Sequence, residues 1–510
     1  MVSFPVFDWR RSVAVILGAL ALCWAAAVNG GPFLHPDSIG YVRGPDVAVM
    51  KLAGERYATA WARFDSGSVD QRHAASAPAA RTASYNDNEV LAGRSIYYGV
   101  LAYLGALTGG FWLTVFVQGL AVAWLTEIIL RALSITSLAA YAGVMAVVAV
   151  ATPAPFFVAF LMPDIWAGAA IGAVATLFAA SGRLRPRDIA ALGAMTVFAA
   201  LAHNSIPPVL ILMAAAGGGW ALLRRGAAKP GLGLAVCALA VIGALAGNLA
   251  FAQMVKHTAG QPPLMPPFLS ARVIADGTGT RFVRERCAGA FVVCRYGDHF
   301  PMSVDDFLWA SGKDGVFETA SSADRRALGA EQTRFALAVV RAYPLEQALA
   351  SARNVAAQAL VTDLSDFNYK PSVAASLTAR TPPAVARVLR GSLAYRQGWP
   401  LGAFWALQSV LVLVSAGAAM GAGLYAGRAG ASPAAASAVL LVGMVVVGVL
   451  ANAAVCGALS TLYGRYEARV IWTLPLAAGA LILAAWPRRA GASWRAERAV
   501  GVRPMAAAES

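Results

Sequence analysis

Residues 433–454 read PAAASAVLLVGMVVVGVLANAA, a run that contains no charged side chain. A helix needs about 20 predominantly apolar residues to cross ~30 Å of hydrocarbon, so this run is long enough to span a membrane. Similar runs recur along the 510-residue chain, in which 58% of residues are hydrophobic and only 13% are charged. Because soluble domains carry about a quarter charged residues, these proportions predict an all-α polytopic membrane protein.

The apolar runs and the basic residues at their ends predict a topology. We expect about ten transmembrane helices, at residues 13–28, 111–130, 138–160, 165–180, 189–201, 206–223, 232–254, 402–424, 433–454 and 470–485. Arg10 and Arg11 precede the first span, and this count places the other Arg-rich connections on the same side. Since Lys and Arg concentrate in cytoplasmic loops, we expect both termini inside a bacterial-type inner membrane. The net charge of +15 then reflects membrane orientation, and no nucleic-acid partner is expected.

Two segments depart from simple crossings. Residues 96–107 are apolar but too short to cross as a helix, and counting them as a span would invert every later loop. We therefore expect a re-entrant or juxtamembrane helix there, on the outer side. Pro153, Pro155 and Pro163 predict a broken helix near the outer end of the third span, where freed backbone groups need protein or water around them.

The first outer loop, residues 30–110, is expected to contain a helix that lies in the membrane interface. Its apolar residues recur at helical spacing, with charged residues between them: Met50, Ala53, Tyr57, Trp61 and Phe64. The following residues, 65–88, are rich in Ser, Ala, Asp and Arg and predict a mobile loop.

These segments divide the chain into four parts. Residues 1–254 form a transmembrane module that includes the first outer loop, and 255–400 form a non-cytoplasmic domain of mainly helical or mixed structure. Residues 401–486 hold the C-terminal transmembrane helices, and 487–510 form a cytoplasmic tail. Cys287 and Cys294 fall in the non-cytoplasmic domain, where an oxidising compartment favours a local disulfide. Two free thiols are the alternative.

Charged and polar residues gather where the predicted spans meet the outer face. They are Asp37 (HPDS, 35–38), Arg94 (GRSIYY, 93–98), Asp164 (MPDIW, 162–166), His203, Arg465 and Tyr466. Such residues are costly at membrane depth, so each needs an explanation. An acid can take a proton from an attacking hydroxyl, and cations can hold a phosphate and stabilise the charge that it gains on leaving.

The order of these residues resembles the GT-C superfamily of polytopic membrane glycosyltransferases, especially the branch of the protein O-mannosyltransferases and lipid A aminoarabinose transferases. The matching features are Pro36-Asp37 after the first span, Arg94 before a short Tyr-containing apolar segment, and Pro163-Asp164 outside the third span. Arg465-Tyr466 before the last span fits more loosely. The resemblance covers roughly residues 1–225 in order, and the rest of the chain only in general layout.

The resemblance implies a transferase that takes sugars from polyprenyl phosphate, usually with inversion at the anomeric centre. The acceptor would be an envelope glycan, lipid or protein. Asp37, as base or metal contact, and Asp164 would be catalytic. The remaining implied site residues are Arg94, Arg465 and His203 for the donor phosphate, and Tyr41, Tyr97 and Tyr466 as substrate contacts. Many members have paired acids in the first loop; the single Asp here weakens the case for a divalent cation such as Mg²⁺ or Mn²⁺.

Each of these residues also has a purely structural interpretation. Asp37 and Asp164 could cap helix N-termini. Arg94 could anchor at lipid headgroups, and His203 could be a polar residue at a helix end. Arg465 could pair with Glu467 or anchor the last span.

The function of the whole protein has alternatives of the same kind. A transporter or lipid flippase could use the same charges as a substrate pathway, although no internal repeat is evident. A non-catalytic partner in envelope assembly is a third possibility. Asp305 and Asp306, before an apolar Phe-Leu-Trp, could face a saccharide or form a solvated turn.

Overall fold

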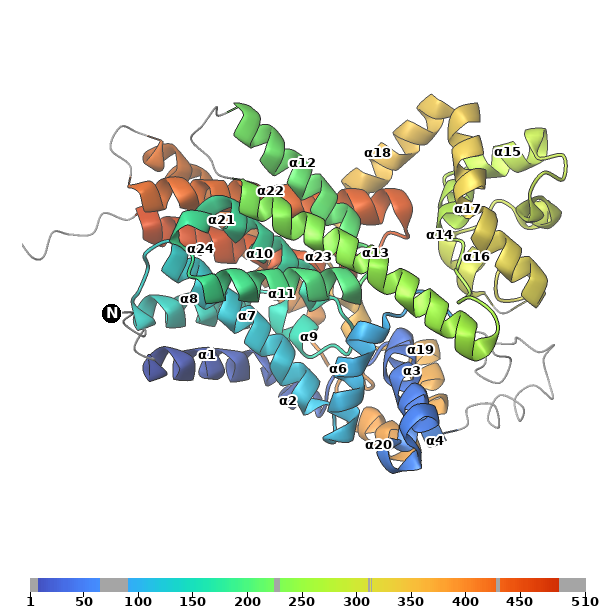
Figure 1. Cartoon of the computed structure of the whole chain (residues 1–510), viewed down its shortest axis with the longest axis horizontal. Coiled ribbons are helices and arrows are strands. Elements are labelled where there is room, and N and C mark those ends of the chain that lie inside the picture. Colours follow the sequence, from blue (N-terminus) through green and yellow to red (C-terminus); the bar gives the residue numbers. More distant parts are fainter. Residues whose placement is uncertain are drawn as a thin grey trace, which may run out of the picture.

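The computed structural model describes residues 8–64, 90–223, 230–310, 312, 314–427 and 432–485. These residues are arranged almost entirely as helices (Figure 1). Their extended pairings are isolated bridges between Phe33 and Phe160 and between Leu91 and Leu264. The predicted loop at 65–88 and the predicted tail at 487–510 lie outside the described residues.

Among the described residues, eight helical segments are long and apolar enough to cross a membrane, which confirms a multi-pass membrane protein. They are α1 (Trp9–Leu22) with α2 (Trp24–Asn29), α7 (Trp112–Ala132), α10 (Ile165–Ala180) with η3 (Ser181–Arg183), α12 (Ile206–Leu223), α13 (Gly231–Ala259), α21 (Leu401–Ala426), α22 (Pro433–Leu459), and α23 (Gly464–Ile471) with α24 (Thr473–Ala485). The two other predicted spans correspond to shorter helices, α8 (Leu138–Ala151) and α11 (Pro186–Ala202).

The remaining helices are shorter or more polar. They are α3 (Pro36–Ala53), η1 (Glu55–Tyr57), α4 (Ala60–Arg63), α6 (Ile96–Leu107), α9 (Ala154–Val158), α14 (Phe268–Ala275), α15 (Thr278–Arg286), η4 (Val292–His299), α16 (Val304–Trp309), α17 (Ser322–Ala342), α18 (Pro344–Leu360), η5 (Ser365–Phe367), α19 (Pro371–Ala379) and α20 (Pro383–Gly391).

The third predicted span is broken, as its prolines predict. α8 ends at Ala151 and α9 begins at Ala154, because Pro153 and Pro155 cannot donate backbone hydrogen bonds to a continuing helix. The carbonyl groups freed beyond the break find a partner in Gln118 of α7. Its Nε2 donates to the carbonyl oxygens of Val158 (2.8 Å) and Phe160 (3.1 Å). The break therefore leads into Asp164 through a segment whose backbone is held by protein.

α6 remains at one end of the transmembrane helices, which agrees with the prediction that residues 96–107 do not cross. At its start, Ser95 Oγ donates to the carbonyl of Leu201 in α11 (2.7 Å). α7 then runs to the opposite end, where Arg11 in α1 donates to Glu127 in α7 (2.6 Å). A full crossing by α6 would have reversed α7 and separated Arg11 from Glu127. Figure 1 shows α6 beside α3, against which it packs.

The interfacial helix expected over residues 50–64 is wrong in its bounds. The helix begins earlier, at Pro36, and ends at Ala53 because Gly54 adopts a positive φ of 89°. A separate short helix, α4, follows. Its free N–H groups are capped by the buried carboxylate of Asp46, which accepts from the backbone of Thr59 and of Ala62 (both 2.9 Å). The chain therefore turns back where the sequence pattern predicts one continuous helix.

The described chain has two hydrophobic cores. The larger core joins the transmembrane helices, and we call the part of the chain built around it the membrane module. The smaller core is formed by residues between Leu264 and Tyr343, and we call this part the small module. The predicted domain 255–400 is divided between them, because the segment from Leu364 to Trp399 packs on the larger core. Figure 1 shows the small module at one end of the transmembrane helices, around α14–α17.

Aromatic contacts fasten the segment after Leu364 to the membrane module. Phe367 lies edge-on to Phe33 (4.9 Å between ring centroids), and Trp399 lies edge-on to Phe156 (5.1 Å). Each such pair adds roughly 0.5–1.5 kcal/mol beyond the area that it buries. Buried Asn29 also accepts from the indole N–H of Trp399 (3.1 Å). The segment between α18 and α21 is therefore packed firmly against the membrane module.

Cys287 and Cys294, the pair predicted from the sequence, are joined by a disulfide in the small module. The other three cysteines of the chain are free and buried.

Candidate functional site

The candidate site begins at the N-terminus of α3. His35 caps this helix, since its Nδ1 accepts from the backbone N–H of Asp37 (3.3 Å) and Ser38 Oγ accepts from the backbone N–H of His35 (2.9 Å). Ser38 also donates to the carbonyl of Leu161 beyond the broken helix (2.8 Å). Neighbouring side chains therefore carry out the capping, and the carboxylate of Asp37 is left for another partner.

That partner is Arg94, which precedes α6. Its guanidinium donates to Asp37 Oδ1. The two side chains remain 31% (Asp37) and 22% (Arg94) exposed, and Arg94 lies 5.5 Å from the ring centre of Trp309 in the small module. Burial acts to raise the pKa of Asp37, but the charge of Arg94, which also donates to it, holds this pKa well below its usual value. Asp37 is consequently ionised at neutral pH.

Close packing of α3 against α6 brings this pair together. Gly99 in α6 faces the backbone of Tyr41 in α3, and a Cβ added at Gly99 would lie 2.7 Å from that carbonyl oxygen. No side chain fits at this distance without moving one of the helices. Gly99 therefore sets the spacing that lets Arg94 reach Asp37.

A second acid lies nearby, at the start of α10. Asp164 occupies the N-cap position, yet its side chain makes no capping hydrogen bond. Its Oδ1 faces two cations instead, Arg465 Nε at 3.7 Å and Arg469 Nη1 at 3.5 Å. Burial acts to raise the pKa of Asp164, but the charges of Arg465 and Arg469 prevail and lower it. The capping interpretation therefore fails for Asp164 as it does for Asp37.

Arg465 is surrounded by acids and rings but is poorly hydrogen-bonded. Its Nη1 lies 3.5 Å from Asp366, beyond ordinary hydrogen-bond distance, and both Nε and Nη1 are buried without a hydrogen-bond partner. Its Cζ lies 5.4 Å from the ring centre of Tyr466 and 5.7 Å from that of Phe160. The expected pairing with Glu467 is absent, since Glu467 accepts from Asn452 (3.0 Å). Buried N–H groups without partners are costly and call for an explanation.

The start of α23, which carries Arg465, is held tightly in place. Gln358 of α18 both donates to the carbonyl of Tyr463 (2.9 Å) and accepts from its N–H (3.1 Å). At Gly464 any side chain would collide with the carboxylate of Asp363. This close approach brings the segment that contains Asp366 against Arg465.

Arg469 is a member of the cluster that the sequence did not single out. It is fully buried, and its Nη2 donates to Ser205 Oγ (2.9 Å) and Asn452 Oδ1 (3.0 Å). Its Nη1 lies 3.3 Å from His203 Nε2. The available signal was its spacing four residues after Arg465, which places both arginines on one helix face.

The two histidines of the site are neutral. Burial and nearby arginines lower the pKa of His203 to about 3 and that of His35 to about 4. His203 Nδ1 accepts from the backbone N–H of Ser205 (3.2 Å). The predicted phosphate contact at His203 is therefore an uncharged group whose ring nitrogen faces Arg469.

The predicted tyrosine contacts separate into two groups. Tyr41 is buried against Tyr98 (5.1 Å between ring centroids), and the charges of Asp37 and Arg94 act on it. Tyr466 covers Arg465. Tyr97 lies apart, because its hydroxyl donates to the carbonyl of Gly247 in α13 (2.9 Å). Tyr97 is predicted to contact substrate, but in the structure its hydroxyl instead joins α6 to α13.

Taken together, the site consists of acids that face arginines. Among the described residues no three His, Cys, Asp or Glu side chains form a group that could hold a metal ion. Asp37 and Asp164 each face a guanidinium, so they do not fit a divalent cation as they are arranged. Mg²⁺ or Mn²⁺ remains a prediction that no step below uses. The partly exposed Arg94 and the under-bonded Arg465 instead suit an anion such as a phosphate.

The fold and site define a multi-pass helical membrane protein with an acid–arginine cluster at one end of its helices. Comparisons with protein-family models, with curated proteins and with solved structures each find no match.

Proposed function

We propose that this protein is a membrane glycosyltransferase that moves a sugar from a polyprenyl phosphate to an acceptor hydroxyl. Transfer takes place at the Asp37 end of the membrane module, which we assign to the outer face of the inner membrane. The acceptor is a glycan, a lipid or a protein. The observation that carries the proposal is the convergence of Asp37, Arg94, Asp164 and Arg465 from distant parts of the chain.

The transfer step uses Asp37 as the proton acceptor. The acceptor oxygen forms a bond to the anomeric carbon while the bond from that carbon to the phosphate oxygen breaks. The bonding electron pair leaves with the polyprenyl phosphate, and the acceptor proton passes to Asp37. Attack from the side opposite the phosphate inverts the anomeric centre. Asp37 is ionised at neutral pH and can therefore accept a proton, but its low pKa makes it a weak base while Arg94 is paired with it.

The phosphate is held by the arginines. Arg94 is partly exposed and can exchange part of its contact with Asp37 for a phosphate oxygen, which would raise the basicity of Asp37 when the donor is bound. The unpartnered Nε and Nη1 of Arg465 offer further donors, which would satisfy groups that are otherwise left buried. Asp164 and Asp366, which lie 3.7 and 3.5 Å from its guanidinium, keep Arg465 in position.

Transfer of radiolabelled sugar from a polyprenyl-phosphate pool, in membranes that carry the wild type, Asp37→Asn or Arg94→Gln, tests the proposal. Loss of the proton acceptor should lower the rate on the order of 10²–10⁴-fold. Arg94→Gln should also lose transfer, because the phosphate loses a charged donor.

Arg295 and Asp324 supply the matched control. They form an ion pair at 2.9 Å in the small module, in which Arg295 is exposed and Asp324 partly buried, so Arg295→Gln and Asp324→Asn remove the same groups away from the site. Both control variants should transfer like the wild type. Normal transfer by Asp37→Asn and Arg94→Gln, at normal protein levels, would refute the assignment and favour a transporter or an assembly partner.

A further inference from the structure

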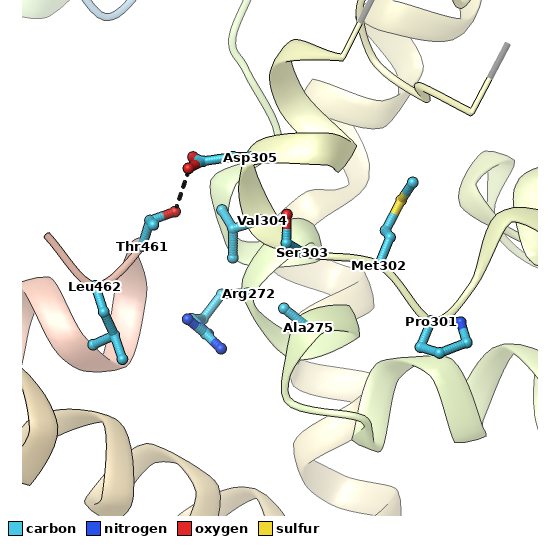
Figure 2. Close-up of a pocket in the computed structure, with 9 residues that line it drawn as sticks. All are labelled: Arg272, Ala275, Pro301, Met302, Ser303, Val304, Asp305, Thr461 and Leu462. Carbon is cyan, nitrogen blue, oxygen red and sulfur yellow. Dashed lines mark hydrogen bonds between the residues drawn. The ribbon is translucent and has the colours of Figure 1, made fainter. Parts of the chain in front are cut away.

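A cavity of about 470 Å³ lies where the small module meets the membrane module. Figure 2 shows its walls: α14 and the segment around α16 on one side, and Thr461 with Leu462, just before α23, on the other. This volume falls within the ~300–1,000 Å³ range of small-molecule sites, and the cavity is a depression that opens widely to solvent. None of the residues assigned to the transfer step lines the cavity.

The polar groups of the cavity are fixed in place by their neighbours. Arg272 donates to Asp276 (2.5 Å) and to the carbonyl of Ser460 (3.2 Å), while its Nε is buried without a partner. Asp276 also accepts from Gln347 (2.8 Å) and Asn354 (2.8 Å). Arg272 and Asp276 are therefore held in one geometry, and Arg272 lines the cavity with a guanidinium that its neighbours keep in place.

Asp305, on α16, is the second charged residue that lines the cavity, and its carboxylate determines which ligand groups can bind there. Its carboxylate accepts from the hydroxyl groups of Thr461 (3.4 Å) and Tyr463. A carboxylate offers about four acceptor positions, so Asp305 can still accept from two hydroxyls of a bound molecule. Asp306 differs, because it is committed to Ser303 at the helix start (2.7 Å). Of the two acids, Asp305 is therefore the one that can contact a ligand.

The charge of the cavity excludes anions. Asp276 neutralises Arg272, which leaves Asp305 as the uncompensated charge among the lining residues and their partners. Like charges brought together cost several kcal/mol, so a phosphate or carboxylate group is disfavoured. Hydroxyl-rich, uncharged molecules fit the acceptor positions of Asp305 and the neutralised guanidinium of Arg272, which both line the cavity.

The position of the cavity connects it with the site of transfer. Asp305 lies near one end of α16 and Trp309, which covers Arg94, lies at the other, about 6 Å along the helix at 1.5 Å per residue. Tyr463, which donates to Asp305, has its ring 5.9 Å from the guanidinium of Arg465. The α16 wall therefore contacts Arg94 through Trp309, and the opposite wall contacts Arg465 through Tyr463. Arg94 and Arg465 are the arginines assigned to the donor phosphate.

We infer that this cavity binds the acceptor, and that the acceptor is an uncharged, hydroxyl-rich saccharide segment. The inference rests on the proposed function and adds the acceptor class and its place of binding. It assigns Asp305 and Arg272 to acceptor recognition, separate from the arginines that hold the donor.

Blocking the cavity covalently tests the inference. Ala275→Cys places a thiol in the cavity wall, and the native cysteines are either buried or joined in the disulfide. Alkylation of purified Ala275→Cys with N-ethylmaleimide then fills the cavity. Two quantities are measured before and after labelling: retention of a radiolabelled polyprenyl-phosphate sugar on the protein, and transfer of that sugar to acceptor in reconstituted envelope membranes.

Labelling should lower transfer roughly tenfold or more while donor retention stays unchanged, because only the acceptor is displaced. Leu345→Cys is the control, since Leu345 is 68% exposed on α18 and its labelling should change neither quantity. Full transfer by completely alkylated Ala275→Cys would overturn the inference, as would a parallel loss of donor retention. If the unlabelled wild type transfers nothing, the proposed function fails first and the acceptor site falls with it.

Discussion

The membrane module has an acid–arginine cluster at each end, and the two clusters are bonded differently. At the Arg11 end, Arg131 meets Asp188 through two parallel hydrogen bonds of 2.8 and 2.9 Å. At the Asp37 end, Arg465 and Arg469 face Asp164 at 3.5–3.7 Å. Asp188 and Asp164 are buried to a similar degree, at 3% and 1% exposed. Burial therefore does not explain the difference.

The difference lies in what each cluster leaves unsatisfied. Oδ2 of Asp164, Nε and Nη1 of Arg465 and Nε of Arg469 are buried without hydrogen-bond partners, whereas no such atom occurs in Arg131, Asp188 or Glu127. A buried ion pair contributes to folding only when its geometry is good and its remaining groups are satisfied. The Arg11 end meets that condition and is structural. The Asp37 end keeps donors free at a cost, which is expected of a site that awaits an anion.

Removing one arginine at each end tests this contrast most strongly. Arg131→Met leaves buried Asp188 with only the exposed Arg187, 3.9 Å away, as a cation, so we expect a loss of about 3 kcal/mol in unfolding free energy. Arg465→Met should cost less than half as much, because it removes two unsatisfied N–H groups and Asp164 keeps Arg469. SDS-induced unfolding in mixed micelles measures both.

Transfer should show the opposite order for the same two variants. Arg465→Met should lose transfer while it remains folded, and the folded fraction of Arg131→Met should transfer normally. Equal losses of stability at the two ends would remove the distinction between a structural and a functional cluster.

The second prediction uses the pH dependence of stability at the Asp37 end. His203 has a pKa of about 3 in the folded protein against roughly 6.5 when unfolded. The unfolded chain therefore binds the proton first, so stability is complete above pH 6.5 and falls as the pH drops below it. At pH 5 the loss from His203 amounts to about 2 kcal/mol.

His203→Asn keeps an acceptor for Ser205 but cannot be protonated in this range. The variant should lose less stability than the wild type between about pH 7.5 and pH 5, and His35 should contribute in the same direction. Thermal unfolding at the two pH values measures the difference. An identical acid loss in both proteins would show that His203 is not held neutral by its neighbours.

Much of the fold follows from local sequence signals. The length of the apolar runs predicts the spans, and the prolines predict the break after Ala151. Residues 96–107 are predicted not to cross because a crossing there would place the later Arg-rich loops on the opposite side of the membrane. The end of α3 at Ala53 does not follow, because the apolar pattern continues past Gly54. The division of residues 255–400 is also invisible, since it depends on ring contacts such as Phe33 with Phe367 that join distant segments.

The sequence predicts those site residues that are charged and lie next to the end of a predicted transmembrane span. Asp37, Arg94, Asp164 and Arg465 meet that description, and the structure brings them together. Asp366 does not, because it lies in a polar segment and reaches Arg465 only through tertiary packing. The choice between capping and pairing likewise required the structure, since one Pro-Asp sequence is compatible with both.

Two adjacent tyrosines, Tyr97 and Tyr98, extend the comparison of structural with functional residues. Their substitution is expected to change the unfolding free energy least. Tyr98 donates to Gln118 (3.1 Å), whose amide holds the carbonyls of the broken helix before Asp164. Tyr97 donates to Gly247 in α13. Each change to Phe removes one hydrogen bond and should cost about 1 kcal/mol in unfolding free energy. Only Tyr98→Phe should also lower transfer, because only Tyr98 supports the backbone that positions Asp164; a loss of transfer in Tyr97→Phe would return Tyr97 to the site.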